Sequence, residues 1–105
     1  MLATTDVMTR LGEVKTKTAE ALRESENDQG ASVVLVAVVR EFDSKAAKAT
    51  RQSDGEGAAR DAVIELEQAG DSAKAAAEAD PGLGAAALQA VQDAHLAICI
   101  LKTEV

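Results

Sequence analysis

His95 and Cys99 are the only histidine and the only cysteine in the chain, and they lie four residues apart. On a helix this spacing places both side chains on one face. An imidazole in this position could lower the pKa of the thiol, and the pair could supply two ligands to zinc. A structural zinc site needs two more ligands, and the sequence has no second His or Cys. We therefore expect no metal and no cofactor, and interpret the pair as residues that flank a helical core.

The segment Asp93–Cys99 surrounds this histidine, and Lys102 follows two turns after it on the same face. With a histidine on a helix of an expected bundle, the segment resembles the histidine phosphotransfer domains, which are four-helix bundles. That resemblance implies that His95 accepts a phosphoryl group, with Cys99 and Lys102 on the same face. The family usually has a lysine three residues after the histidine and a small residue beside it, where this chain has Ile98 and Cys99. The histidine also lies on a different helix from that of the family.

Other catalytic motifs are missing from the sequence. Di-iron bundles need a Glu-x-x-His pair on each of two helices, and the residue three positions before the single histidine is Gln92. The sequence contains no nucleophile elbow, phosphate-binding glycine-rich loop or dinucleotide fingerprint. Asp61 and Glu65 form a carboxylate pair at helical spacing, which we interpret as part of a solvated acidic face. We therefore expect that the protein is not an enzyme.

Four segments carry apolar residues at the three- and four-residue steps of amphipathic helices. We predict helices over residues 4–27, 31–52 and 55–79, and a last one from 81 or 84 to 102. The expected inward positions are Val7, Leu11, Val14, Thr18, Ala21 or Leu22, Ser25; Leu35, Val38, Val39, Phe42, Ala46, Ala49; Ala59, Ala62, Val63, Leu66, Ala69, Ala73, Ala76; and Leu83, Ala87, Val91, Ala94, Ile98, Leu101. Short turns between such helices favour an all-α, antiparallel up-down-up-down four-helix bundle.

Several polar residues match the preferences of helix N-termini. Thr4, Thr5 or Asp6 can cap the first helix, and Ser53 with Glu56 has the form of a capping box before the third. Asp80-Pro81 predicts an N-cap followed by the first residue of the last helix.

Residues 33–39 fit two structures, because this run is rich in β-branched side chains. The alternative fold is a small α/β protein with strands near 33–40 and 96–101. Two strands alone do not form an independent sheet. The stripe Leu35, Val39, Phe42 also continues into a clearly helical segment, so we favour the helix.

The composition favours one domain over residues 1–105 with an unusual core. The chain has 23 alanines, Phe42 is its only aromatic residue, and Gly70 interrupts the third helix. This glycine costs about 1 kcal/mol relative to alanine, and could permit a close helix crossing or mark a bend. We detect no repeat of fixed period in the sequence.

The charge of the chain restricts its partners. The net charge is −7, and residues 53–80 carry eight acids and only two bases. Phosphate contacts need clustered Lys and Arg, so we expect no nucleic-acid binding. No apolar run approaches the ~20 residues that span a bilayer, and the first residues lack the pattern of a signal peptide. We therefore expect no membrane partner and a cytoplasmic location.

Two segments carry more apolar residues than a bundle helix needs. Val33 and Val36 point away from the stripe of the second helix, and Leu96 and Ile100 away from that of the fourth. Exposed apolar groups mark partner surfaces. We therefore predict a protein that works by association, as a homodimer, an adaptor or a chaperone-like partner. The phosphotransfer alternative instead requires an exposed His95 without apolar cover.

Overall fold

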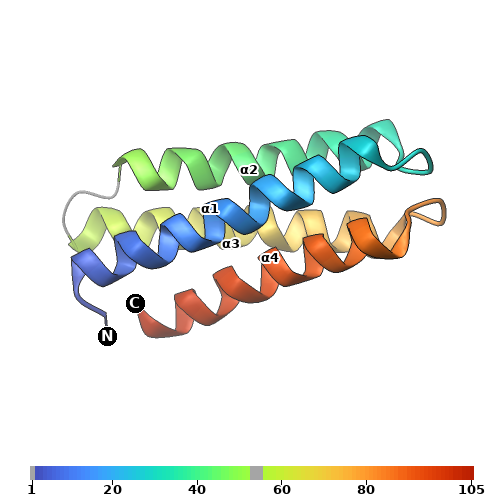
Figure 1. Ribbon diagram of the computed structural model, residues 1–105. Coiled ribbons are helices and arrows are strands. Elements are labelled where there is room, and N and C mark those ends of the chain that lie inside the picture. The colour runs from blue at the N-terminus through green and yellow to red at the C-terminus, as the bar shows by residue number, and fades with distance from the viewer. Residues whose placement is uncertain (1, 53–55) are drawn as a thin grey trace.

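Apolar residues at helical spacing fold the chain into four α-helices. The computed structural model describes residues 2–52 and 56–105. The helices are α1 (Thr4–Asn27), α2 (Val33–Gln52), α3 (Glu56–Ala79) and α4 (Ala85–Glu104). Consecutive helices are antiparallel, and each packs against the next one in the chain. The last helix, α4, also packs against α1 (Figure 1). α2 and α4 therefore lie across the bundle from each other. The predicted up-down-up-down four-helix bundle is confirmed.

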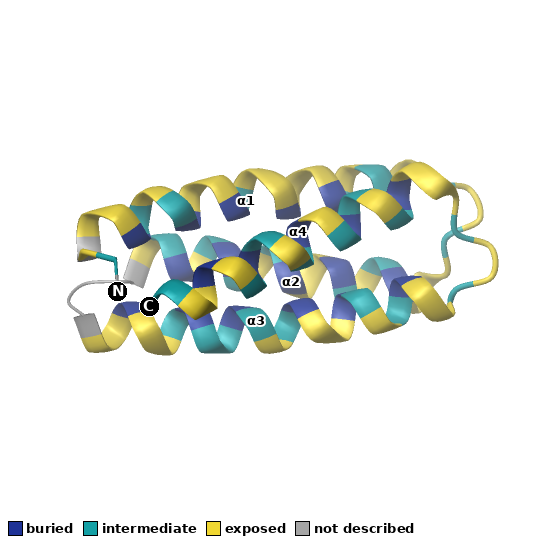
Figure 2. Cartoon of the chain, turned by 90° about the horizontal axis from the view of Figure 1, so that it is seen from below, coloured by how far each residue is buried: buried dark blue, intermediate teal, exposed yellow. Residues whose placement is uncertain are grey.

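The predicted inward stripes form the core. Residues on the inner side of all four helices are buried, and those on the outer side are exposed (Figure 2). On α1 the buried member of the predicted pair is Ala21, and on α3 Ala77 is buried where the prediction had Ala76. The other predicted positions that are only partly buried are Val38, Ala62, Ala69 and Leu83. The periodicity thus identified the core faces correctly, with errors of one residue at their edges.

The strand alternative is wrong for both segments that it involved. Residues 96–101 lie inside α4, and α2 begins at Val33. The described part of the chain contains helices and no strand. The physical reason is continuity: Leu35, Val39 and Phe42 form one buried face along α2, so tertiary packing outweighs the β-propensity of the valines.

Phe42 is the largest fully buried side chain, and its ring lies directly over Gly70 of α3. A Cβ atom at Gly70 would lie 3.0 Å from the Cζ atom of Phe42 and 3.3 Å from the Cγ2 atom of Ile98. The missing side chain therefore makes room for the ring. Gly70 thus provides space for the Phe42 ring at the cost of its lower helix propensity, while the predicted close helix crossing or bend at this position stays a prediction.

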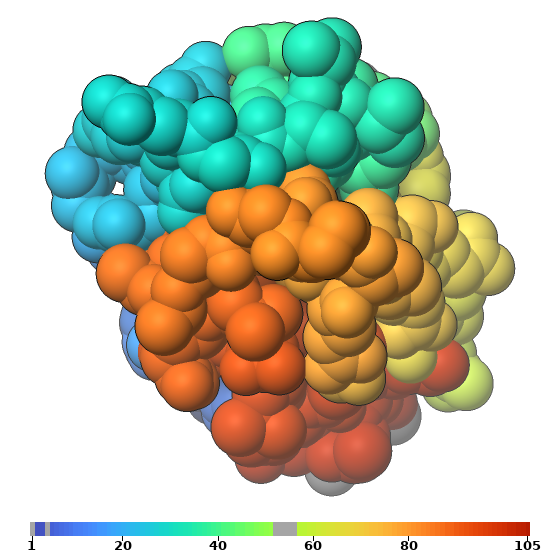
Figure 3. Space-filling view, turned by 90° about the vertical axis from the view of Figure 1, so that its right-hand side faces the viewer, coloured from blue at the N-terminus to red at the C-terminus, as the bar shows by residue number. Residues whose placement is uncertain are grey.

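At one end of the bundle, the two short turns exchange helix caps: an aspartate of each turn bonds to the start of the helix that follows the other turn. The N–H of Ser32, which precedes α2, donates to Oδ2 of Asp80 at 3.0 Å. The N–H of Gly84, which precedes α4, donates to Oδ2 of Asp28 at 2.8 Å. Each carboxylate therefore lies at the N-terminus of a helix in the other helical hairpin, where negative charge is stabilising. Figure 3 views this end, where the turns pack against each other.

The predicted caps differ from those observed. Asp80 does not cap α4 and Pro81 is not its first residue, because α4 begins at Ala85 after the N-cap Gly84. Ala3 is the N-cap of α1 and no side-chain cap bond forms there, so the predicted capping by Thr4, Thr5 or Asp6 is wrong. The capping box predicted at Ser53 and Glu56 falls outside the residues whose side chains the structure describes.

The two turns also match in backbone detail. A Cβ atom at Gly30 would collide with the carbonyl oxygen of Gly82, and one at Gly82 would collide with the carbonyl oxygen of Gly30. Each glycine N–H donates to the aspartate two residues before it, at 2.8 Å in the first turn and 3.0 Å in the second. Glycine at both positions lets the two backbones touch.

The bundle is a repeated helical hairpin. Every boundary of α3 and α4 lies 52 residues after the corresponding boundary of α1 and α2. The buried positions repeat at the same interval: Val39 corresponds to Val91, and Phe42 corresponds to Ala94. No repeat is detectable in the amino-acid sequence, because most paired positions hold different residues. The repeat is therefore one of geometry and turn chemistry.

Replacement of Phe42 by alanine should destabilise the protein by about 3–5 kcal/mol, because the change opens a cavity over Gly70 that small neighbours cannot refill. Urea unfolding followed by circular dichroism measures this loss. A loss below about 1 kcal/mol would contradict the central place of the ring.

Replacement of Asp80 by asparagine tests the turn contact through pH. The hydrogen bond from the Ser32 N–H holds the pKa of the Asp80 carboxyl below its ordinary value. The charged form therefore stabilises the fold above the unfolded-state pKa of about 4, and that contribution is lost as the pH falls through the lower folded-state pKa. The wild type should be more stable than Asp80→Asn at pH 7, and the difference should shrink in acid. If the difference in unfolding free energy between the two proteins stayed the same as the pH fell well below about 4, the assigned role of the charged Asp80 carboxylate would be contradicted.

Candidate functional site

The contact surface between α3 and α4 brings together the titratable residues that the sequence singled out. The Nε2 atom of His95 lies 2.7 Å from Oδ1 of Asp71 on α3. The Sγ atom of Cys99 lies 3.4 Å from the same Nε2 atom. The shared face predicted for His95 and Cys99 is thus confirmed, and Asp71 completes a three-residue cluster. Sequence reasoning missed Asp71 because it is 24 residues away and looked like one of several surface acids.

The buried faces of α3 and α4 determine where the cluster of Asp71, His95 and Cys99 lies. His95 and Cys99 each follow a buried residue of α4, Ala94 and Ile98, and therefore lie on the flank of that helix. Asp71 follows Gly70, which is buried on α3, and lies on the facing flank. One turn of helix separates the two members on α4, so all three polar groups reach one spot at the edge of the core.

The phosphotransfer alternative requires an exposed His95, whereas this side chain is mostly covered and paired. Its side chain is 17% exposed, against 58% for Asp71, and its Nε2 atom is engaged by the carboxylate. Lys102, the predicted third member of the phosphoacceptor group, bonds instead to Oε2 of Glu67 on α3 at 3.2 Å. Both residues of α4 are thus paired with acids of the neighbouring helix.

Cys99 has a raised pKa, contrary to the expectation that a neighbouring imidazole lowers it. Burial raises the pKa of the thiol, and the Glu67 and Asp71 carboxylates raise it further by disfavouring a second negative charge. Cys99 is a free cysteine and is partly buried. The thiol is therefore an unreactive group at neutral pH when no cation is present.

The predicted interface residues fall into two separate patches. Leu96 and Ile100 are 58% and 45% exposed on the outer face of α4. Val33, at 86%, is exposed at the first turn of α2, where Val34 is also exposed and Val36 is partly buried. The sequence placed Val36 in this patch and missed Val34, because the start of the helix could not be located to the residue. None of the helices in the described part of the chain combines the length and apolar character that a bilayer span requires.

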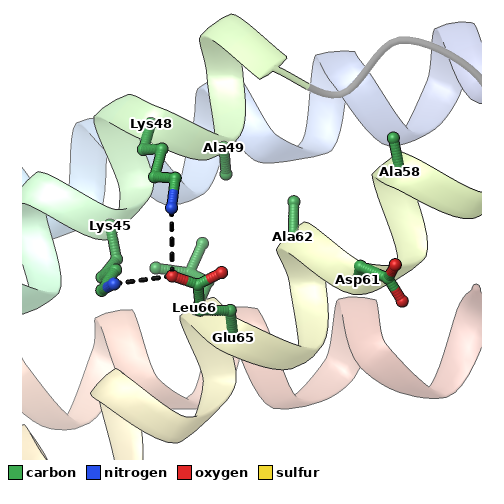
Figure 4. A pocket seen from close by; sticks show the side chains of 8 residues that line it. All are labelled: Lys45, Lys48, Ala49, Ala58, Asp61, Ala62, Glu65 and Leu66. Atoms are coloured by element: carbon green, nitrogen blue, oxygen red, sulfur yellow. Dashed lines mark hydrogen bonds and ion pairs between the residues drawn. The ribbon is translucent and has the colours of Figure 1, made fainter.

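A pocket of about 250 Å³ lies between α2 and α3 (Figure 4). The Nζ atom of Lys45 lies 2.6 Å from Oε1 of Glu65, and that of Lys48 lies 3.4 Å from it. These lysines hold the pKa of the Glu65 carboxyl below its ordinary value. Asp61 lines the same pocket. Glu65 therefore bridges two helices, and its charge is matched within the pocket.

Comparison with known proteins gives no independent assignment: no protein-family model matches the chain, and neither curated proteins nor solved structures show significant similarity. Function must therefore be inferred from the residues and their geometry.

Replacement of Asp71 by asparagine should lower the pKa of Cys99 toward that of an ordinary thiol, because the change removes one of the negative charges that raise it. The pH dependence of alkylation by iodoacetamide measures this shift. Asp93→Asn is the matched control, because it removes the same charge from the outer face of α4. If the thiol of the wild type titrates below an ordinary cysteine, the assigned environment is wrong.

Proposed function

We propose that the protein acts by self-association, through the outer face of α4 with Leu96 and Ile100 at its centre. The observation that carries this proposal is that two large aliphatic side chains, one turn apart, are about half exposed on the same face. Full burial of an exposed large aliphatic side chain contributes roughly 1.5–3 kcal/mol, and a dimer contact can add about half of that for each of these two, which are already half buried. A reducing cytoplasmic compartment suits the free thiol of Cys99 beside this surface.

The charges of the helices support a second copy of the chain as the partner. Among the exposed residues of α4 only Asp93 and Lys102 are charged. The exposed side of α3 carries several acids, so pairing it with its own copy would place like charges together. A contact between two copies through the outer face of α4 therefore meets less charge repulsion than one through α3. An antiparallel pairing about a two-fold axis between Leu96 and Ile100 brings each against the other residue of the partner.

The position of α2 separates its apolar patch from this interface. Because α2 and α4 lie across the bundle from each other, their outer faces point in opposite directions. One two-fold interface therefore covers Leu96 and Ile100, or Val33 and Val34, but not both. A contact between the α2 patch of one copy and the α4 patch of the next would build a ring or an open chain of molecules, and not a two-fold dimer. We select α4 because its patch lies in the middle of a long, sparsely charged face.

The test is the molar mass in solution by light scattering, over a wide range of protein concentration. The wild type should approach the mass of a dimer, and Leu96→Glu with Ile100→Glu should be a monomer that remains helical by circular dichroism. The matched control, Val33→Glu with Val34→Glu, adds the same charge to α2 and should leave the dimer intact.

Two results would contradict the proposal. Dissociation by the α2 variant alone would assign the interface to the wrong helix. A wild-type monomer at every concentration would exclude self-association, and the α4 face would then have to serve a different protein.

A further inference from the structure

The cluster at the contact between α3 and α4 has the composition of a transition-metal site. The ligand atoms of Asp71, His95 and Cys99 all lie within 4.8 Å of one another. They offer a carboxylate, an imidazole and a thiolate, the three side-chain donors that proteins use for zinc. Helices on both sides position them, so the donors are held by the core and not by a loop.

The distances suit one small cation. Zinc binds sulfur at about 2.3 Å, and nitrogen or oxygen at about 2.0–2.2 Å. Tetrahedral coordination at these lengths therefore separates neighbouring donor atoms by roughly 3.3–3.7 Å. The separation between Cys99 Sγ and His95 Nε2 is 3.4 Å, and that between His95 Nε2 and Asp71 Oδ1 is 2.7 Å. A small outward movement of the half-exposed Asp71 side chain is enough to admit the ion.

We propose that Asp71, His95 and Cys99 bind one Zn²⁺ ion, with a water molecule or an exogenous ligand in the fourth position. Binding replaces the hydrogen bond between Asp71 and His95 with two metal bonds. It also releases the proton of the Cys99 thiol to solvent, so affinity falls as the pH is lowered. The imidazole binds in its neutral form through Nε2, and the proton that Nε2 donates to Asp71 in the metal-free protein moves to Nδ1.

Charge around the cluster favours a cation. Glu67 and Asp71 both act on the Cys99 thiol, and Glu78 lies further along the same surface of α3. Lys102 pairs with Glu67, and Lys74 pairs with Glu78. The Asp71 carboxylate has His95 as its partner, which carries no fixed charge, so a divalent ion supplies the missing positive charge.

The internal repeat shows that the site belongs to one half of the bundle. The positions 52 residues before Asp71, His95 and Cys99 hold Ala19, Asp43 and Ala47, which lack the imidazole and the thiol. Asp43 there bonds to the hydroxyl of Thr18 at 2.8 Å and to Lys15 at 2.9 Å. We therefore expect one ion per chain. Because a single chain supplies all three ligands, metal binding does not depend on the proposed dimer.

The test is titration of the reduced protein with Co²⁺, a spectroscopic substitute for zinc. A tetrahedral cobalt site with one thiolate gives visible absorption bands and a near-ultraviolet charge-transfer band, both of which should saturate at one equivalent and disappear when Zn²⁺ is added. Cys99→Ser should abolish the charge-transfer band. His95→Gln and Asp71→Asn should each weaken binding more than tenfold, because even residues outside the first shell of a metal contribute about 10–100-fold.

Asp93→Asn is the matched control, since it removes an exposed carboxylate from α4 and should not change affinity. Leu96→Glu with Ile100→Glu should also keep the site, which separates this proposal from the proposed dimer. Zn²⁺ should slow alkylation of Cys99 in the folded wild type. The proposal is overturned if cobalt gives no charge-transfer band with the wild type. It is also overturned if the variants Cys99→Ser, His95→Gln and Asp71→Asn bind the metal as tightly as the wild type, or if zinc leaves the alkylation rate of Cys99 unchanged.

Discussion

The contact between the ring of Phe42 and the bare backbone of Gly70 is the constraint on which the rest of the bundle depends. The ring is the only aromatic group in an interior whose most frequent residue is alanine, and the absent side chain on α3 makes room for it. At the equivalent positions of the repeat, Thr18 corresponds to Gly70 and Ala94 to Phe42, so the other hairpin does not repeat this pair. Close helix packing therefore compensates for the small area that each alanine buries.

Most of the fold could be predicted from local pattern, and the errors arose where a distant segment decides the outcome. The spacing of Leu35, Val39 and Phe42 located the buried face of α2 and outweighed the β-propensity of its valines. Asp80 was assigned to the wrong helix, because its partner Ser32 lies 48 residues away in the other turn. The repeat was invisible because burial and turn geometry are shared between the hairpins, whereas residue identity is not.

In the candidate sites, too, local pattern predicted some features, and contacts between distant segments decided the others. Helical spacing brought His95 and Cys99 together, but their third partner depends on how α3 packs on α4, which no local pattern contains. The raised pKa of Cys99 also depends on this packing, because burial raises it and the Glu67 and Asp71 carboxylates of the neighbouring helix raise it further. The exposed apolar patch on α4 could be predicted from the sequence, because Leu96 and Ile100 lie outside the buried stripe of that helix. Three features therefore lie on α4: its inner face packs in the core, one flank carries His95 and Cys99, two of the three proposed metal ligands, and its outer face carries the proposed self-association patch.

A double-mutant cycle on Phe42→Ala and Gly70→Ala tests the central packing constraint most directly, with free energies of unfolding from urea denaturation. With the ring present, the new methyl group has no space, and Gly70→Ala should destabilise the bundle. With the ring removed, the same change should cost less or stabilise the bundle, because helix propensity favours alanine by about 1 kcal/mol while the Cγ2 atom of Ile98 still lies 3.3 Å from the new methyl group. A coupling free energy above about 0.5 kcal/mol would show that the two residues act as a unit. Equal effects of Gly70→Ala in both backgrounds would contradict the account.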